Sequence, residues 1–230
     1  MTSPDASGSA VAVVIARNEA TSIGRTVTSA ATIPMISSVV VVDGDSLDGT
    51  AERAAEAGAT VIPAPHHGGK GRALEGAFDV LPPAPAYLLL DGDVGETATA
   101  AAPLLIPVLS GELDLCVGRL PRQETGGFGM VKRFAGRLVA SQGSFRPSDP
   151  LSGQRAATRD LLEACRPFAW GFGLETAMTM DAVRLGFRVG ELGVEMRHRP
   201  TGRDVAGFLH RGRQGADIVR AALPRLAGVR

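Results

Sequence analysis

Two short acidic motifs, Asp43-Gly44-Asp45 and Asp91-Gly92-Asp93, are the first candidates for chemistry in this sequence of 230 residues. Each comes directly after an apolar run, residues 39–42 and 87–90. Two carboxylates separated by one glycine can turn toward one ligand, and carboxylate oxygens suit hard cations such as Mg²⁺ and Mn²⁺. A diphosphate needs such a cation to neutralise its charge when it leaves. The motifs therefore predict metal–diphosphate chemistry, although Asp-Gly-Asp also forms ordinary turns.

Short apolar runs separated by helical patterns must position these acids. Strands are expected at residues 11–15, 37–42, 59–63 and 87–90, and helices at about 20–31, 48–57 and 72–81. Apolar strands that alternate with helices indicate an α/β fold, with a mostly parallel central sheet flanked by helices. Ligands bind beyond the carboxyl ends of such strands, where both acidic motifs lie.

The second half of the chain is less regular, and no linker separates it from the first. Strands are expected at residues 114–117 and 188–194, and helices at residues 130–142, 158–165, 175–185 and 204–223. Gln123–Gly129 is glycine-rich and is expected to be a loop that closes over a bound ligand. The chain is therefore expected to form a single domain.

Lys70 is a further candidate because glycines surround it. Gly68, Gly69 and Gly71 predict a loop with backbone positions that other residues cannot adopt, which allows close approach to a ligand. The alternative is a flexible loop with a solvated lysine. The first strand runs into Ala16-Arg17-Asn18-Glu19 at the same expected edge of the sheet, where Asn18 is a candidate helix cap and pocket residue.

Glu175 is the candidate general base. It follows Trp170-Gly171-Phe172-Gly173, a glycine-rich turn with two aromatic rings on which an apolar ligand surface would stack. Glu175 is either the base for an acceptor hydroxyl or only the first-turn acid of its helix. Trp170 is the only tryptophan, and core packing is the ordinary role of such a residue.

Arg155 and His198 each have two interpretations. Arg155 ends Ser152-Gly153-Gln154-Arg155, expected as a loop before a helix, and either binds a phosphate or carboxylate or forms a structural salt bridge. His198 lies between Arg197 and Arg199. Neighbouring positive charges disfavour its protonation, so it is either a neutral metal ligand or an exposed loop histidine.

Charge is unevenly divided along the chain. Residues 1–115 carry 5 Lys/Arg against 14 Asp/Glu, whereas residues 116–230 carry 19 against 10. We interpret this as a cation site in the first half and an anion-facing surface in the second, with compositional drift as the alternative. No nucleic-acid partner is expected.

The expected compartment is the cytoplasm. Residues 1–9 are polar, are expected to be disordered, and lack the features of a signal peptide. No run of about 18 apolar residues is present to span a membrane. Cys116 and Cys165 match no metal-ligand spacing and are expected to be reduced thiols in the core.

The expected last helix, residues 204–223, is apolar on one side and basic overall. The apolar side carries Val205, Phe208, Leu209, Ala216, Val219 and Leu223, and the basic residues are Arg211, Arg213, Arg220 and Arg225. Such a helix either lies on the anionic inner face of a membrane, or packs on its own domain with a solvated basic face. A homodimer is also left open.

Several segments together resemble the family 2 glycosyltransferases of the GT-A fold. In order they are Ala16–Glu19, Val42–Thr50, Gly69–Gly71 and Leu90–Asp93, within residues 11–97. Leu151–Arg155, Gly171–Glu175 and Met196–Arg199 look like a bacterial subgroup similar to dolichol-phosphate mannose synthases and glucosyl-3-phosphoglycerate synthases. The resemblance implies a nucleotide-sugar-binding half, residues 10–97, and an acceptor half, residues 98–230.

The resemblance also implies roles for single residues. Ala16, Arg17, Glu19, Asp43, Lys70 and Gly92 would bind the nucleotide, Asp91 the ribose or the metal, and Asp93 and His198 the metal. Gly153, Gln154, Arg155 and Trp170 would form the acceptor side of the sugar pocket. Members of the family often have Asp-Asp-Gly-Ser where this chain has Asp43-Gly44-Asp45-Ser46, which leaves the role of Asp45 open.

The activity implied is metal-dependent transfer of a hexosyl group with Mg²⁺ or Mn²⁺. The donor would be a UDP-sugar rather than a GDP-sugar, and the acceptor an anionic small molecule or a polyprenyl phosphate. If Glu175 is the base, inversion follows, whereas the phosphoglycerate-type relatives retain configuration. Two alternatives are a sugar-nucleotide nucleotidyltransferase, disfavoured because no glycine follows the first strand until Gly24, and an inactive nucleotide-sugar-binding protein.

Overall fold

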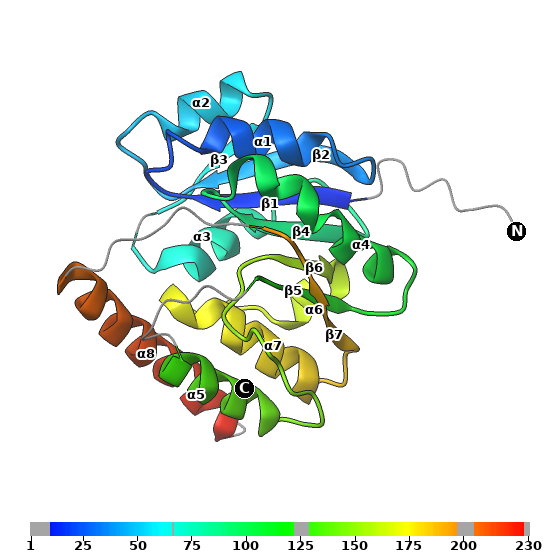
Figure 1. Cartoon of the computed structure of the whole chain (residues 1–230), viewed down its shortest axis with the longest axis vertical. Helices are drawn as coiled ribbons and strands as arrows, with labels where there is room; N and C mark the ends of the chain where they lie inside the picture. The colour runs from blue at the N-terminus through cyan, green and yellow to red at the C-terminus, as the bar shows by residue number, and fades with distance from the viewer. Residues whose placement is uncertain (1–9, 66, 122–128, 197–204, 228–230) are drawn as a thin grey trace, which may run out of the picture.

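The computed structural model of the chain describes residues 10–65, 67–121, 129–196 and 205–227. Within these residues, seven strands form one sheet between layers of helices (Figure 1). The strands are β1 (Ala10–Ala16), β2 (Ile36–Asp43), β3 (Thr60–Pro63), β4 (Ala86–Asp91), β5 (Leu115–Arg119), β6 (Arg155–Thr158) and β7 (Val189–Gly193). They stand in the order β3-β2-β1-β4-β6-β5-β7, and only β6 is antiparallel to its neighbours within this sheet. The expected mostly parallel α/β sheet is confirmed.

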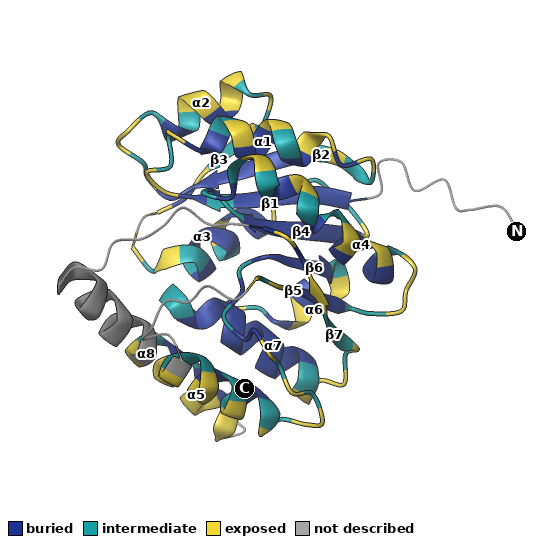
Figure 2. Cartoon of the chain, in the orientation of Figure 1, coloured by how far each residue is buried: buried dark blue, intermediate teal, exposed yellow. Residues whose placement is uncertain are grey.

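The helices cover both faces of the sheet. They are α1 (Ile23–Ala31), α2 (Thr50–Glu56), α3 (Gly69–Phe78), α4 (Ala102–Leu109), α5 (Gly129–Ala140), α6 (Arg159–Ala164), α7 (Leu174–Arg184) and α8 (Val205–Leu226), with the short 3-10 helices η1 (Gly95–Ala101) and η2 (Gly171–Gly173). Successive β1 residues serve different cores, because Val14 packs in the cluster with Val27 of α1 and Val13 in the cluster with Leu74 of α3. The central strands are therefore buried on both sides (Figure 2).

The carboxyl ends of β2, β1 and β4 lie side by side. Asp43 is the register partner of Ala16, and Asp91 is the register partner of Ile15. Both acidic motifs therefore stand at one edge of the sheet, as their position after apolar runs predicts. This edge is where ligands bind in parallel sheets.

Two predicted loops are parts of regular elements instead. Helix α3 begins at Gly69, so Lys70 lies in its first turn, and the preceding Gly68 takes the left-handed backbone with φ of 98°. Arg155 opens β6, which pairs antiparallel with β4 and β5. The short run Arg155–Thr158 has little apolar character of its own, and pairing on both sides makes it a strand.

Helix α2 starts later than residue 48, where the sequence predicts its beginning. Its N-cap is Gly49, with φ of 86°, and not Asp48. The Asp48 carboxylate accepts hydrogen bonds from the backbone N–H of Thr50 at 3.2 Å and of Ala20 at 3.1 Å. Asp48 therefore joins the start of α2 to the turn after β1.

The described part of α8 packs on the domain through a different stripe from the one predicted. Ile218, Ala222 and Arg225 are buried, whereas Val219 and Leu223 are exposed. Arg225 Nε donates to the buried Asp181 Oδ2 of α7 at 2.8 Å, and this pair sets the rotation of the helix. Within the described residues no helix is both long and apolar enough to cross a bilayer.

Several predicted features lie outside the described residues. They are the N-terminal residues 1–9, most of Gln123–Gly129, and the side chains of Val205, Phe208, Leu209, Arg211 and Arg213. Cys116 and Cys165 are both buried and form no disulfide, as predicted.

Candidate active site

Asp43 is held in a network that joins the ends of β1 and β2. Its side chain accepts hydrogen bonds from Ser46 Oγ at 2.5 Å and from Ser46 N at 3.1 Å. Ser46 Oγ in turn accepts from Asn18 N at 2.9 Å, and Asn18 Oδ1 accepts from Leu47 N at 3.0 Å. Asn18 therefore ties two loops together and does not cap α1. Asp43 is buried, whereas Asp45 is exposed in the same turn.

The second acidic motif packs closely against the end of β1. A Cβ on Gly92 would lie 2.8 Å from Ala16 Cβ and 3.3 Å from Glu19 Cγ, so only glycine fits there without displacement. Thr26 Oγ1 donates to Gly92 O at 3.0 Å and accepts from Gly95 N at 2.9 Å. Thr26 was missed as a site residue because it lies on α1, far from the motif in sequence.

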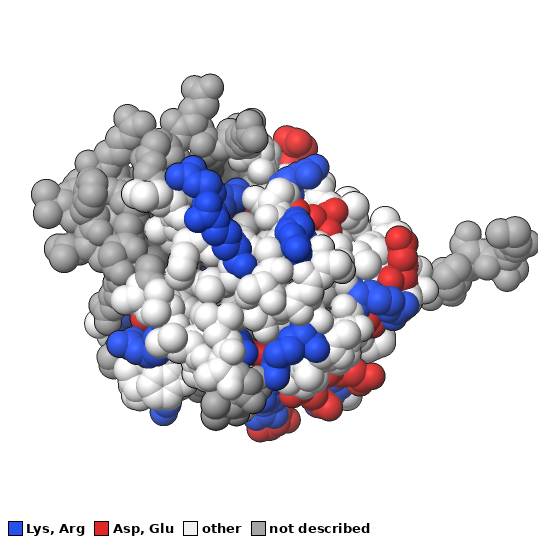
Figure 3. Space-filling view, turned by 90° about the horizontal axis from the view of Figure 1, so that it is seen from below, with Lys and Arg blue, Asp and Glu red and all other residues white. Residues whose placement is uncertain are grey.

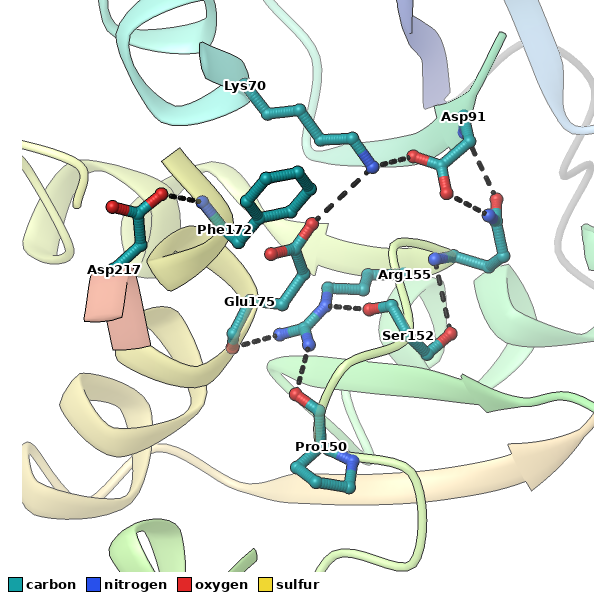
Figure 4. A network of polar contacts seen from close by, with 9 residues as sticks. Lys70, Asp91, Pro150, Ser152, Arg155, Phe172, Glu175 and Asp217 are labelled. Carbon is teal, nitrogen blue, oxygen red and sulfur yellow. Dashed lines mark hydrogen bonds and ion pairs between the residues drawn. The ribbon is translucent and has the colours of Figure 1, made fainter. Parts of the chain in front are cut away.

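Asp91, the last residue of β4, is contacted from two directions (Figure 4). Lys70 Nζ forms an ion pair with Asp91 Oδ1, and Gln154 Nε2 donates to Asp91 Oδ2 at 2.9 Å. The Asp91 backbone N–H also donates to Gln154 Oε1 at 3.3 Å. A Cβ at Gly153 would lie 2.6 Å from Asp91 Oδ2, which leaves room for glycine alone. The carboxylate is thus fixed in place by a cation and an amide.

Lys70 joins Asp91 to Glu175. Lys70 Nζ lies 3.7 Å from Glu175 Oε1, in the first turn of α7. Burial lowers the pKa of Lys70, but the charges of Asp91 and Glu175 outweigh it and raise that pKa overall. Burial raises the pKa of the Glu175 carboxyl, and nearby Asp91 adds to this, against the opposing charges of Lys70 and Arg155. A buried carboxyl with a raised pKa suits proton transfer.

Close contact between α3 and the η2 turn brings Lys70 and Glu175 together. Gly171 N donates to Gly68 O at 2.7 Å, and a Cβ at Gly69 would lie 2.9 Å from the Gly171 Cα. The N-termini of α3 and α7 therefore meet at this point. Both helix ends favour negative charge, so the region suits a phosphate or a carboxylate.

Arg155 is structural, and the prediction that it binds an acceptor anion is wrong. Its side chain is 1% exposed, and burial lowers its pKa. The guanidinium donates to the backbone carbonyls of Ser152 and Glu175, each at 2.8 Å, and to Thr179 Oγ1 at 2.9 Å. These bonds fix the backbone of Glu175 and leave Arg155 facing the interior. The predicted salt bridge is replaced by hydrogen bonds to carbonyl groups.

Trp170 lies at the surface and not in the core. It is 60% exposed, and the Arg72 guanidinium lies 5.1 Å from the centre of its ring. Arg17 is also exposed, on the turn after β1. Both side chains are therefore open to a ligand.

The proposed metal ligands are only partly described. Asp91 and Asp93 lie one residue apart at the end of β4, but His198 lies outside the described residues. In the part of the chain that is described, no three His, Cys, Asp or Glu side chains gather closely enough to hold a metal ion. The metal set therefore stays a prediction that depends on residues 197–204.

Gln154 gives a test of this arrangement. We expect Gln154→Glu to lower the free energy of unfolding by about 1–3 kcal/mol at neutral pH, because a second carboxylate would replace the amide donor beside Asp91. The charge of Asp91 should raise the pKa of the new carboxyl above the ordinary glutamate value of about 4.3, so that at about pH 4.5 it is protonated and donates to Asp91, and the loss should shrink. Urea unfolding at about pH 4.5 and about pH 7.5 measures this. A loss that is equal at both pH values would contradict the proposed contact.

A family comparison bears on these residues. The model for glycosyl transferase family 2 matches residues 11–142. The chain belongs to glycosyl transferase family 2. This family 2 match runs from β1 through α5 and includes Asp43, Lys70, Asp91 and Asp93, whereas Glu175 lies beyond it.

Two relatives of this family 2 chain are glycosyltransferases by name. Glycosyltransferase AglJ of Haloferax volcanii is 33% identical over 170 residues, which cover 72% of this chain and 56% of the relative. Glucosyl-3-phosphoglycerate synthase of Mycolicibacterium smegmatis is 30% identical over 213 residues, which cover 78% of this chain and 66% of the relative. The chain thus spans between 56% and 66% of the length of these two proteins.

A solved structure extends the likeness to nearly the whole chain. Glucosyl-3-phosphoglycerate synthase from Mycobacterium tuberculosis, in complex with Mn²⁺, UDP-glucose and phosphoglyceric acid, is 27% identical with a TM-score of 0.74. The alignment covers 96% of this family 2 chain and 80% of the synthase chain. The GT-A fold expected from the sequence is confirmed.

Proposed function

We propose that this chain is a metal-dependent glycosyltransferase that moves a hexosyl group from a UDP-sugar to a phosphorylated or otherwise anionic acceptor. The observation that carries the proposal is Lys70, which joins the strand-end acid Asp91 to the helix-end acid Glu175. This contact supports the proposal, because a diphosphate site at Asp91 and a proton acceptor at Glu175 would then lie side by side. The synthase solved with Mn²⁺, UDP-glucose and phosphoglyceric acid supports the same combination of ligands.

Residues 10–97 would bind the donor. Ala16, Arg17 and Glu19 would line the base and ribose pocket, and Asp43, fixed by Ser46, would accept a hydrogen bond from the base. A uracil ring offers one N–H donor for such a carboxylate. Lys70 and the backbone at Gly92 would lie beside the phosphates, where a lysine is a suitable point charge.

Mg²⁺ or Mn²⁺ would be held by Asp91, Asp93 and His198. Carboxylate oxygens and imidazole nitrogen form a donor set that suits these ions, and the order of Asp91 imposed by Gln154 favours binding. When bound, the cation would neutralise the charge that develops on the departing diphosphate. The ammonium group of Lys70 forms an ion pair with the same carboxylate of Asp91.

Residues 98–230 would bind the acceptor. The acceptor hydroxyl would give its proton to Glu175, its oxygen would bond to the anomeric carbon, and the bond from that carbon to the diphosphate would break. Gly153, Gln154 and the exposed Trp170 would border the acceptor, while Arg155 holds the Glu175 backbone from behind. Attack opposite the diphosphate would invert the anomeric centre, so the configuration of the product by NMR tests the role of Glu175.

The proposal is tested by product analysis with UDP- and GDP-sugars, with and without Mn²⁺, in the presence of 3-phosphoglycerate. Free nucleoside diphosphate and a glycosylated acceptor are expected, with the UDP-sugar preferred. Pyrophosphate release would instead support a nucleotidyltransferase. A donor-dependent rise in melting temperature without turnover would support a nucleotide-sugar-binding protein.

The raised pKa of Glu175 predicts the pH profile. A base must be deprotonated to act, so kcat should fall as the pH drops through a pKa above the ordinary glutamate value of about 4.3. Glu175→Gln should lower kcat by about 100- to 10,000-fold and remove this acidic limb. Steady-state kinetics between about pH 4.5 and about pH 8.5 measure both effects.

Glu163→Gln, on the exposed side of α6, is the matched control for Glu175→Gln and should keep the wild-type profile. If Glu175→Gln retains both kcat and the acidic limb, another group is the base.

A further inference from the structure

A cluster of exposed apolar side chains lies on α5 and α8. Eleven large hydrophobic side chains are exposed among the described residues, and five of them belong to these two helices: Met130, Phe134, Val219, Leu223 and Leu226. Met130 is 74% exposed and Leu223 is 59% exposed. The two helices pack beside each other and on α7 (Figure 1). The surface that carries these five residues is here called the α5–α8 face.

Buried contacts on the opposite side of α8 keep the α5–α8 face exposed to solvent. Arg225 and Asp181 form an ion pair in which both side chains are nearly inaccessible, and Ala222 packs with Val139 of α5 in a small core. Val219 and Leu223 therefore cannot turn inward without breaking that pair. Isolated exposed hydrophobic residues are ordinary, but a cluster on two adjacent helices indicates an interaction site.

Basic side chains stand among the apolar ones. On α5 the exposed stripe runs Met130, Arg133, Phe134, Arg137, and on α8 Arg220 lies beside Val219. A groove beside α5 is lined by Lys132, Arg133, Arg137 and Arg146, with a volume of about 610 Å³. The face therefore combines apolar side chains with a groove lined by basic residues.

Two acidic residues close to this surface form ion pairs with its basic residues. Asp149 pairs with Lys132 at 3.0 Å, and Asp217 contacts Arg220 at 3.4 Å and accepts from Phe172 N at 3.3 Å. Figure 3, which views this end of the molecule, shows Lys and Arg among uncharged atoms, with most Asp and Glu toward the right and lower edges. Arg133 and Arg137 have no acidic partner among the described residues, so the described part of this surface has an excess of positive charge.

We propose that the α5–α8 face docks on an anionic lipid bilayer, with Met130, Phe134, Val219, Leu223 and Leu226 in the interfacial region and the arginines on lipid phosphates. Apolar side chains interspersed with Lys and Arg are typical of surfaces that lie in the plane of a charged membrane. A second copy of this chain is disfavoured, because a two-fold interface pairs the same patch of both copies and would bring two basic surfaces together. The inference is independent of the proposed reaction.

Vesicle flotation of the full chain tests the proposal. Vesicles of phosphatidylcholine alone are compared with vesicles that contain about 30% phosphatidylglycerol, at about 50 mM and about 500 mM NaCl. We expect binding to the anionic vesicles at low salt, at least about tenfold weaker binding at high salt, and little binding to neutral vesicles. No binding to anionic vesicles, or equal binding to both kinds, would overturn the proposal.

Paired substitutions test whether the α5–α8 face is the surface that contacts the vesicles. Arg133→Glu combined with Arg137→Glu, and separately Phe134→Ser combined with Leu223→Ser, should each reduce flotation at least about tenfold with little change in melting temperature. The matched controls are Arg25→Glu on α1 and Ile106→Ser on α4, both exposed and remote, which should bind as the wild type does. Equal losses in the controls would refute this location.

Measurement of the oligomeric state distinguishes docking on a membrane from docking on a second copy of this chain. Light scattering of the wild type and of Phe134→Ser with Leu223→Ser is expected to give the same mass. A wild-type dimer that this pair converts to a monomer would assign the face to a second copy and overturn the membrane proposal.

Discussion

Asp93→Asn should abolish the rise in melting temperature that a UDP-sugar produces together with Mn²⁺, and should reduce sugar transfer by more than about 100-fold. The reason is the position of Asp93 in the turn after β4. Gly92 packs this turn closely against Ala16, and Thr26 donates a hydrogen bond to the Gly92 carbonyl. Asparagine keeps the shape of the side chain and removes its charge. Thermal shift with donor alone, metal alone and both together measures the binding effect without reference to turnover.

Asp45→Asn is the matched control for Asp93→Asn, because it changes the same position of the first acidic motif. Asp45 is exposed and has φ of 60°, a backbone conformation that asparagine also tolerates. This variant should keep the metal-dependent stabilisation. If Asp93→Asn keeps it too, or if both variants lose it equally, the assignment of the metal to the second motif is wrong.

Gly71→Ala should destabilise the fold by about 3 kcal/mol or more. A Cβ at this position would lie 1.7 Å from the backbone oxygen of Ala169 and 2.8 Å from its carbonyl carbon. Backbone atoms cannot rotate aside, so α3 would have to move away from the η2 turn and would carry Lys70 away from Glu175. Urea unfolding measures the loss of stability, and transfer activity in the folded fraction measures the displacement of Lys70.

Gly76→Ala on the same helix is the matched control for Gly71→Ala. Gly76 is exposed, and no atom lies within 4 Å of the position its Cβ would take. Alanine is the better helix former, so Gly76→Ala should stabilise the protein by about 0.5–1 kcal/mol. Equal stabilities for the two alanine variants would show that α3 does not contact the η2 turn as described.

Local sequence patterns were sufficient to predict the layers of the fold and the edge of the sheet at which the acidic motifs lie. Each central strand is a continuous apolar run, and only burial on both faces makes such a run stable as a strand. Because parallel strands share one direction, an acid that follows a buried strand must lie at the ligand-binding edge. Asp43 and Asp91 were therefore placed correctly from their sequence position alone.

Contacts between distant segments were not predictable in the same way. The hydrogen bond from Gln154 to Asp91 joins residues 63 positions apart, and it depends on β6 entering the sheet beside β4. No periodic pattern marks β6, since its stability comes from pairing with β4 and β5. For the same reason Arg155 was expected in a loop, whereas the structure buries its guanidinium under α7.

The sequence by itself determined which residue types carry the chemistry: paired carboxylates after buried strands, a lysine among glycines, and a glutamate at a helix start. Tertiary structure alone decided that Lys70 stands between Asp91 and Glu175, and that α8 turns Val219 and Leu223 outward. The physical reason is the distance along the chain over which each effect acts. Burial patterns and backbone propensity are set by a few neighbouring residues. The direction in which a side chain points depends on packing between elements that are distant in the sequence, and no local pattern predicts that packing.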